Sequence, residues 1–219
     1  GGINRRVADV PAKFITVEGG EGAGKTTQLA FMGEYLERTG RRVLLTREPG
    51  GTALGEEIRA LLLGHRHDGM GLATETLLMF AARAEHLQRL VRPALAAGHW
   101  VLCDRFTDAT YAYQSGGRGL PPAKVAALED WVQGDLRPDL TLLFDLPVEV
   151  GLERARRRGA ADRFEREDRV FFERVRTVYL DRARQNLDRY RIVNADRPPD
   201  AVRFEVETLL ARWLERIDG

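Results

Sequence analysis

The sequence has few of the features that mark several common classes of protein. It contains one cysteine, Cys103, so no internal disulfide can form, and this usage fits a reducing compartment. No apolar run approaches the roughly 18 residues that a transmembrane helix requires, and the first residues lack a signal-peptide pattern. The four histidines show no metal-ligand spacing with cysteines or carboxylates. The net charge is only +1, so neither a nucleic acid nor a membrane is an expected partner.

The composition is that of an ordinary globular protein. Of the 219 residues, 43% are hydrophobic and 31% are charged, which suits a single domain with a buried core. We expect residues 14–219 to form this domain. Residues 1–13, which begin Gly-Gly-Ile-Asn without a methionine, are expected to be a leader segment outside it.

Hydrophobic patterning predicts alternating strands and helices. Five short apolar runs are typical of strands buried on both faces of a parallel sheet, at residues 14–18, 42–46, 100–104, 140–145 and 190–194. Helical patterns separate them at residues 25–38, 53–63, 73–96, 122–133, 147–158, 168–186 and 199–217. This alternation predicts an α/β fold, a doubly wound five-stranded parallel sheet with helices on both faces. Ligands of such sheets bind beyond the carboxyl ends of the strands.

The first strand runs directly into a glycine-rich loop. Residues 14–27 read FITVEGGEGAGKTT, which contains G-x-x-x-x-G-K-[ST] between a strand and a helix. The glycines allow successive backbone N–H groups to point at phosphate oxygens, where a β-carbon would clash. Lys25 can reach the β- and γ-phosphates, and the Thr26 hydroxyl can ligate Mg²⁺. The residues expected to bind a nucleoside triphosphate are Gly19, Gly20, Glu21, Gly22, Ala23, Gly24, Lys25, Thr26 and Thr27.

A phosphate-binding loop occurs in kinases, GTPase switches and motor proteins. A GTPase needs Asn-Lys-x-Asp to read guanine, but the only asparagines are Asn4, Asn186 and Asn194, and none precedes lysine. Two other strand ends carry charged groups. Asp104-Arg105 can hold Mg²⁺ and clamp a phosphate, and the loop 46–52 (Thr-Arg-Glu-Pro-Gly-Gly-Thr) begins with a further arginine. Two arginines at adjacent strand ends favour a second phosphate group as acceptor.

Several motifs occur in the order found in the thymidylate kinases, and the chain resembles that family from about Phe14 to its C-terminus. They are EGGEGAGKTT (18–27), TREPGGT (46–52), RAEH (83–86), DRF (104–106) and TYAYQSGGRGL (110–120). The resemblance implies a P-loop kinase that transfers the γ-phosphoryl group of ATP to dTMP with Mg²⁺, in dTTP biosynthesis. It also implies a cytoplasmic homodimer, whose interface we expect on apolar positions of helices 73–96 and 122–133.

The resemblance also implies roles for individual residues. Arg47 and Arg105 would bind the acceptor phosphate, Arg83, Thr110 and Gln114 the thymine edge, and Tyr113 would pack against the deoxyribose. Phe80 is expected to stack on the base, with Met79 as the alternative because both share a helix face with Arg83. Glu21, a carboxylate inside an anion-binding loop, is expected to contact the acceptor's 3′-hydroxyl or a Mg²⁺-bound water. With Lys25 and Arg105, it is a candidate catalytic residue, and Asp104 joins Thr26 as a candidate metal ligand.

Residues 154–169 (RARRRGAADRFEREDR) are rich in arginine and occupy the position of a lid in nucleotide kinases. The phosphate loop itself has no arginine, so the resemblance implies that the lid supplies the charge that stabilises the transferring phosphoryl group. Arg158 is the leading candidate, followed by Arg156 and Arg163, and the remaining arginines are expected to face solvent or form ion pairs. Two alternatives stay open: another (deoxy)nucleotide or nucleoside kinase, and a non-catalytic nucleotide-regulated scaffold.

Overall fold

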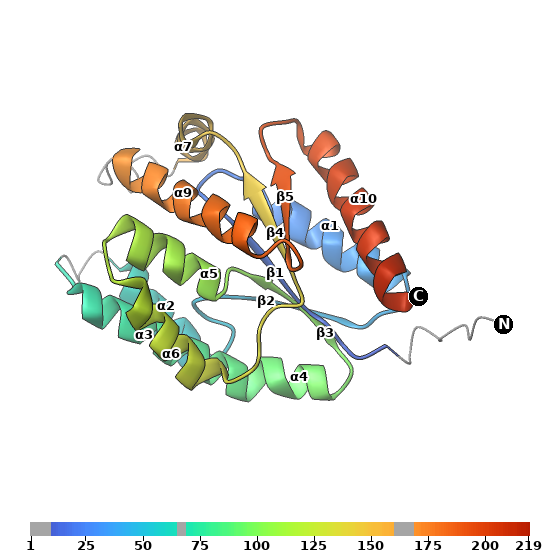
Figure 1. The fold of residues 1–219 in the computed structure, drawn as a ribbon, viewed down its shortest axis with the longest axis horizontal. Helices are drawn as coiled ribbons and strands as arrows, with labels where there is room; N and C mark the ends of the chain where they lie inside the picture. Colours follow the sequence, from blue (N-terminus) through green and yellow to red (C-terminus); the bar gives the residue numbers. More distant parts are fainter. Residues whose placement is uncertain (1–9, 65–68, 160–168) are drawn as a thin grey trace.

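The computed structural model describes residues 10–64, 69–159 and 169–219. Within these residues, five strands form one parallel sheet in the order β2-β3-β1-β4-β5 (Figure 1). The strands are β1 (Phe14–Gly19), β2 (Val43–Arg47), β3 (Trp100–Asp104), β4 (Leu140–Asp145) and β5 (Tyr190–Asn194). The predicted α/β sheet is therefore confirmed, with strand limits within one residue of those expected.

The register of the sheet brings the functional motifs together. The central strand β1 pairs with β3 on one side and β4 on the other, and Val17 lies beside Asp104. On the far side of β3, Arg47 lies beside the same Asp104. Because parallel strands end at the same edge, the phosphate loop, Arg47 and Asp104-Arg105 share one end of the sheet.

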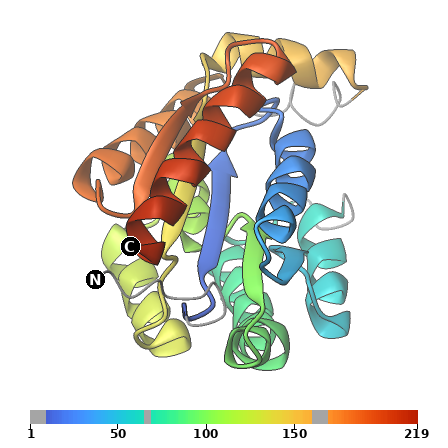
Figure 2. The ribbon, with the colours of Figure 1, turned by 90° about the vertical axis from the view of Figure 1, so that its right-hand side faces the viewer.

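Two helices, α1 (Lys25–Arg38) and α10 (Pro199–Asp218), cover one face of the sheet. The two helices contact each other, and Figure 1 shows both running alongside the strands. Figure 2 shows α10, in red, in front of the sheet. They bury the main core cluster, in which the rings of Trp100 and Trp213 meet edge to face with centroids 5.9 Å apart. Val10 is also buried in this cluster, although it belongs to the segment expected as a leader. The limit of the domain at residue 14 stays a prediction.

The other face of the sheet is covered by a second group of helices (Figure 1). They are α3 (Leu72–His86), the π-helical η3 (Leu87–Val91), α4 (Arg92–Ala96), α5 (Thr107–Thr110), the π-helical η4 (Tyr111–Gly117), α6 (Pro122–Gln133) and α9 (Arg169–Gln185), while α2 (Ala53–Leu63) packs on α3. A further helix, α7 (Val148–Arg157), follows β4. No helix of the described ranges combines the length and apolarity that crossing a membrane would require.

Two segments differ from the helices expected from the sequence. The helix expected at 73–96 is unbroken but changes to π-helical winding at Leu87–Val91, just before Pro93, which has no backbone N–H to donate. The segment 107–117, for which no helix is expected, forms α5 and η4. Its glycines favour close packing rather than helix formation: a β-carbon on Gly117 would lie 2.4 Å from the ring of Phe171 in α9.

Candidate active site

The phosphate loop connects β1 to α1 and has the conformation that its glycines allow. Gly22 and Gly24 have φ angles of 73° and 76°, in the left-handed region that favours glycine. Gly24 is the N-cap of α1, and the first turn of this helix contains no acidic residue. The loop therefore presents the positive end of a helix dipole and unobstructed backbone N–H groups, which together favour a phosphate.

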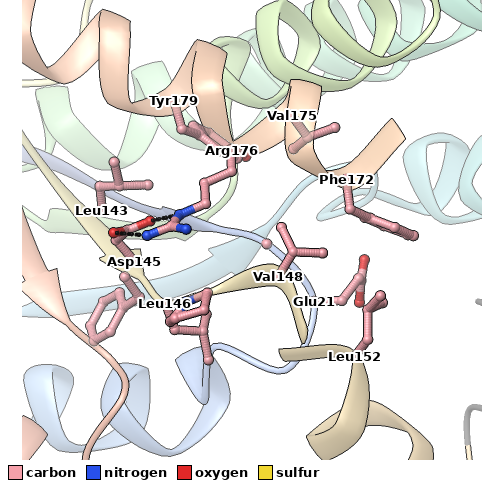
Figure 3. Close-up of a pocket in the computed structure, with 13 residues that line it drawn as sticks. Glu21, Leu143, Asp145, Leu146, Val148, Leu152, Phe172, Val175, Arg176 and Tyr179 are labelled. Atoms are coloured by element: carbon pink, nitrogen blue, oxygen red, sulfur yellow. Dashed lines mark hydrogen bonds and ion pairs between the residues drawn. The ribbon is translucent and has the colours of Figure 1, made fainter. Parts of the chain in front are cut away.

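The loop packs so closely on the start of α7 that only glycine fits on either side. A β-carbon on Gly22 would lie 2.1 Å from the carbonyl oxygen of Gly151, and one on Gly151 would lie 2.3 Å from the carbonyl oxygen of Glu21. Figure 3 shows the crevice behind the loop, of about 30 Å³, between α7 and α9. Asp145 accepts two hydrogen bonds from Arg176 at its edge, of 2.9 and 3.1 Å. Helix α7, which leads into the segment expected to be a lid, thus packs directly against the phosphate loop.

Lys25 and Asp104 form an ion pair of 2.8 Å across the ends of β1 and β3. Burial and the nearby charge of Arg105 lower the pKa of the Lys25 amine, whereas Asp104 raises it. Thr26, at the first turn of α1, is exposed. The two expected metal ligands therefore flank Lys25, and the described residues contain no group of three or more His, Cys, Asp or Glu side chains arranged for a metal.

Arg105 lies between the phosphate loop and a large cavity. It is the one described non-glycine residue with a positive φ, 67°, a conformation that costs roughly 1–2 kcal/mol. Its guanidinium donates to the carbonyl of Gly19 (3.2 Å) and the hydroxyl of Tyr113 (3.1 Å), and lies 3.6 Å from a carboxylate oxygen of Glu21. These contacts bring Glu21, Arg105 and Tyr113 together, as the sequence predicts.

A buried carboxyl group, Glu18, holds the backbone next to Arg105. It accepts hydrogen bonds from the N–H of Phe106 (2.8 Å) and the hydroxyl of Tyr179 in α9 (2.9 Å). Burial, together with the negative charge of Asp108, raises the pKa of Glu18 to about 8. The raised pKa favours the neutral form of Glu18, which reduces negative charge beside the phosphate loop.

The cavity, of about 450 Å³, extends from Arg105 to the end of α3. Arg83 reaches it from a fully buried network: its Nε donates to Glu48 (2.6 Å) and its Nη1 to Thr110 (3.1 Å). The other oxygen of Glu48 bonds to Nδ1 of His86 (2.7 Å). Hydrogen bonds from two of its guanidinium nitrogens thus fix the orientation of the planar Arg83 head group.

Gln114 lies at the same end of this cavity. Its amide nitrogen donates to Glu75 (2.8 Å), while its buried carbonyl oxygen Oε1 has no partner. The expected base-edge residues Arg83, Thr110 and Gln114 therefore come together.

Two expected site residues, Phe80 and Arg47, lie outside the cavity or point away from it. Phe80 is buried with Leu120 and Val125 in a cluster towards α6, whereas the preceding residue, Met79, lines the cavity. The geometry thus favours Met79 over Phe80 because a step of one residue turns a helical side chain by roughly 100°. Arg47 is half-exposed and pairs with Glu56 of α2 at 2.8 Å. Arg163 is outside the described residues.

A second cavity, of about 290 Å³, lies on the α1 side of the phosphate loop. Arg158 lines it with Arg154 and Arg157, next to the turn after β5. Arg154, for which we expect a solvent-facing or ion-paired position, donates to the carbonyl of Ala195 in this turn (2.8 Å). Arg156, expected here, is exposed and lies 3.3 Å from Glu153 on its own helix.

Sequence reasoning missed several residues that support the site. Glu48 and His86 are within the quoted motifs, but no spacing predicts that they meet, because they come from separate elements. Glu18 begins the quoted motif 18–27, but nothing in the motif predicts that its carboxyl group is buried against Phe106 and Tyr179. Glu75 and Gly151 lie outside the quoted motifs, and their importance arises from contacts made across the fold.

The fold and the site together define a phosphotransferase of the P-loop kinase class, with a triphosphate loop facing a separate cation-lined acceptor cavity.

The family model for thymidylate kinase matches residues 17–206. A thymidylate kinase of Pseudomonas savastanoi pv. phaseolicola is 59% identical over 202 residues, which are 92% of this chain and 96% of the relative. One of Pseudomonas putida (strain W619) is 58% identical over 206 residues, 94% and 100% of the two chains. The crystal structure of thymidylate kinase from Ehrlichia chaffeensis aligns with a TM-score of 0.73 at 34% identity, covering 91% of this chain and 98% of that one. The chain belongs to the thymidylate kinase family.

Because Gly151 contacts the phosphate loop, we expect an alanine at this position to destabilise the protein, although helix propensity alone predicts stabilisation. Alanine normally stabilises a helix interior by about 0.5–1 kcal/mol relative to glycine. We expect Gly151→Ala instead to lower the melting temperature and to lower kcat/KM for ATP at least about tenfold, because a displaced loop binds phosphate poorly. Gly33→Ala, in α1, is the matched control, since its β-carbon meets only the Leu45 side chain at 3.3 Å. Wild-type behaviour of Gly151→Ala would contradict the assigned role.

Proposed function

We propose that the protein transfers the γ-phosphoryl group of ATP to dTMP, giving ADP and dTDP, and thereby serves dTTP synthesis. The observation that carries this proposal is the meeting of two cavities at one phosphate loop. The cavity on one side includes Ala23, Gly24 and Thr27, and that on the other includes Glu21 and Arg105. Two phosphorylated molecules can therefore approach each other end to end across the loop, as an in-line transfer requires.

The acceptor phosphate would bind Arg105, with Arg47 as its second cation. Arg105 already points between Gly19 and Tyr113 and is partly buried, which strengthens a charge-assisted hydrogen bond. Arg47 would exchange Glu56 for the phosphate, a step that an ion pair between half-exposed groups permits at little energetic expense. Tyr113 would pack against the deoxyribose.

The far end of the cavity suits the edge of thymine. Arg83 offers N–H donors for the O4 acceptor of the base, and the unpartnered Oε1 of Gln114 offers an acceptor for N3–H. Thr110 supports Arg83 through its hydroxyl. Met79 is the side chain that we propose to cover the ring, in place of Phe80.

The donor side would bind ATP through the loop and through Arg154, Arg157 and Arg158, which line the second cavity. Lys25 would contact the β- and γ-phosphates once they compete with Asp104 for its ammonium group. Thr26 and Asp104 fit Mg²⁺, which accepts one or two oxygen ligands from protein and takes the rest from phosphate and water. When bound, Mg²⁺ would neutralise charge on the phosphates. Arg158 is the proposed cation for the transferring group.

This chemistry needs positioning and charge neutralisation and no covalent intermediate. A phosphomonoester has a second pKa of about 6, so its attacking oxygen is already deprotonated at neutral pH. No histidine is needed as a general base, and the buried position of His86 between Glu48 and Thr46 suits a structural role. We also propose a cytoplasmic location, where ATP and dTMP are both available.

We further propose that the protein is a homodimer joined through α3 and α6. A hollow of about 580 Å³ between these helices is lined mainly by apolar side chains, including Leu77 and Phe80. Trp131 is 81% exposed beside it. A projecting ring next to an apolar hollow on the same face can fit a second copy related by a two-fold axis, because each copy supplies both parts.

The function is tested by measuring ADP release with each of four acceptors: dTMP, dUMP, UMP and thymidine. We expect dTMP to be used best and thymidine not at all, because thymidine lacks the phosphate that Arg105 and Arg47 would bind. UMP should be poor because its 2′-hydroxyl would meet Tyr113. ADP release that dTMP does not stimulate would overturn the proposal, and efficient use of thymidine would reassign the acceptor class.

Arg158→Ala should lower kcat by at least about 100-fold, since a positioned arginine in phosphoryl transfer is worth about 10³–10⁵ in rate. KM for dTMP should change by less than about threefold because the acceptor lies in the other cavity. The control is Arg156→Ala. Arg156 is an exposed arginine that pairs with Glu153, and its loss should leave wild-type kinetics. Equal losses in the two variants, or a loss confined to dTMP affinity, would contradict the assignment of Arg158.

Trp131→Glu should raise the dimer dissociation constant at least about 30-fold, the effect of a central interface residue. Sedimentation equilibrium measures this change directly. Phe204→Glu, on α10, replaces an aromatic ring that is 72% exposed and serves as the matched control. The proposed interface is wrong if both variants stay dimeric or if the wild-type protein is a monomer.

A further inference from the structure

One acidic side chain in the acceptor cavity has no part in the proposed chemistry. Glu75 lies in the first turn of α3, four residues before Met79 and eight before Arg83, so the three share one helix face. Its side chain is only 19% exposed. A carboxylate so placed should repel an anionic substrate, and its position therefore calls for a different explanation.

Glu75 makes two hydrogen bonds with the segment that carries the base-edge residues. One of its oxygens, Oε1, accepts from Nε2 of Gln114 (2.8 Å) and from Nε of Arg118 (3.1 Å). Arg118 supplies the opposite charge and also lies over the ring of Phe171, 5.4 Å from its centroid. The carboxylate is thus fixed between an amide and a guanidinium.

The chemistry of these groups fixes which end of the Gln114 amide faces the base. The two ends of an amide have nearly the same shape, but one donates hydrogen bonds and the other accepts them. A carboxylate only accepts, so the NH₂ end of Gln114 must face Glu75. The carbonyl oxygen then faces away, and it is the buried atom without a partner.

The orientation of this amide distinguishes the two kinds of pyrimidine. Thymine and uracil present N3–H, a donor, whereas cytosine presents an unprotonated N3, an acceptor. A Gln114 carbonyl that faces the base accepts a hydrogen bond from N3–H of thymine or uracil. Opposite cytosine, the carbonyl oxygen would meet the N3 lone pair, and two acceptors that face each other are unfavourable in a buried site. We propose that Glu75 is a positioning residue that sets base specificity by holding the Gln114 carbonyl towards the base. This inference rests on the proposed function of the same cavity.

The test is Glu75→Gln, which keeps the size of the side chain but can donate as well as accept, so that Gln114 can present either end. We expect kcat/KM for dTMP and dUMP to fall by the same factor, about tenfold, the effect of one hydrogen bond. The value for dCMP should not fall, so discrimination between dTMP and dCMP drops by the same factor. In a Gln114→Ala background, Glu75→Gln should leave this discrimination unchanged, since its effect passes through Gln114.

The control is Glu85→Gln, which removes a carboxylate of the same helix that pairs with Arg89, and it should leave all three substrates unaffected. An equal loss for dTMP, dUMP and dCMP in Glu75→Gln would indicate a merely structural role and overturn the inference. Unchanged discrimination would overturn it as well. Wild-type enzyme that does not prefer dTMP to dCMP would overturn the proposed function, and this inference with it.

Discussion

The site depends on the way a buried carboxyl group, Glu18, holds the end of β3. It accepts hydrogen bonds from the backbone of Phe106 and from Tyr179, so the last residue of β1 before the phosphate loop is tied both to the turn after β3 and to α9. This turn contains Arg105 in a left-handed conformation, which only surrounding contacts can maintain. The core thus holds the backbone of Arg105, and hydrogen bonds to Gly19 and Tyr113 then orient its guanidinium between the phosphate loop and the cavity.

The acceptor cavity follows the same rule of indirect support. Arg83 is oriented by Glu48, Gln114 by Glu75, and the phosphate loop by Gly151, and none of these supporting residues belongs to the same element as the group it supports. Such an arrangement fixes the direction of each polar group before a ligand enters. Preorganisation of this kind reduces the ordering that binding would otherwise require, and phosphoryl transfer gains most from accurate positioning.

Three charged pairs of the site differ in how easily a ligand could separate them. Lys25 pairs with Asp104 in a mostly buried position, whereas Arg47 pairs with Glu56 near the surface. Arg83 and Glu48 are almost fully buried and accept no such exchange without a large desolvation penalty. We therefore expect phosphate groups to displace the first two pairs, and the third to stay intact as part of the cavity that we propose to bind the base.

The sequence by itself determined the strand–helix alternation, the parallel sheet and the phosphate loop, because hydrophobic runs and glycine spacing are local properties. Its motifs also brought Arg83, Arg105, Thr110 and Gln114 to one site through a resemblance. It favoured Phe80 over Met79 as the residue that covers the base, whereas Met79 is the one that lines the cavity. Which of two adjacent helical residues faces a site depends on what packs against each side of the helix. The π-helical winding of 111–117 and the roles of Glu18, Glu75 and Gly151 were decided by the tertiary structure, because each arises from contacts between elements far apart in the chain.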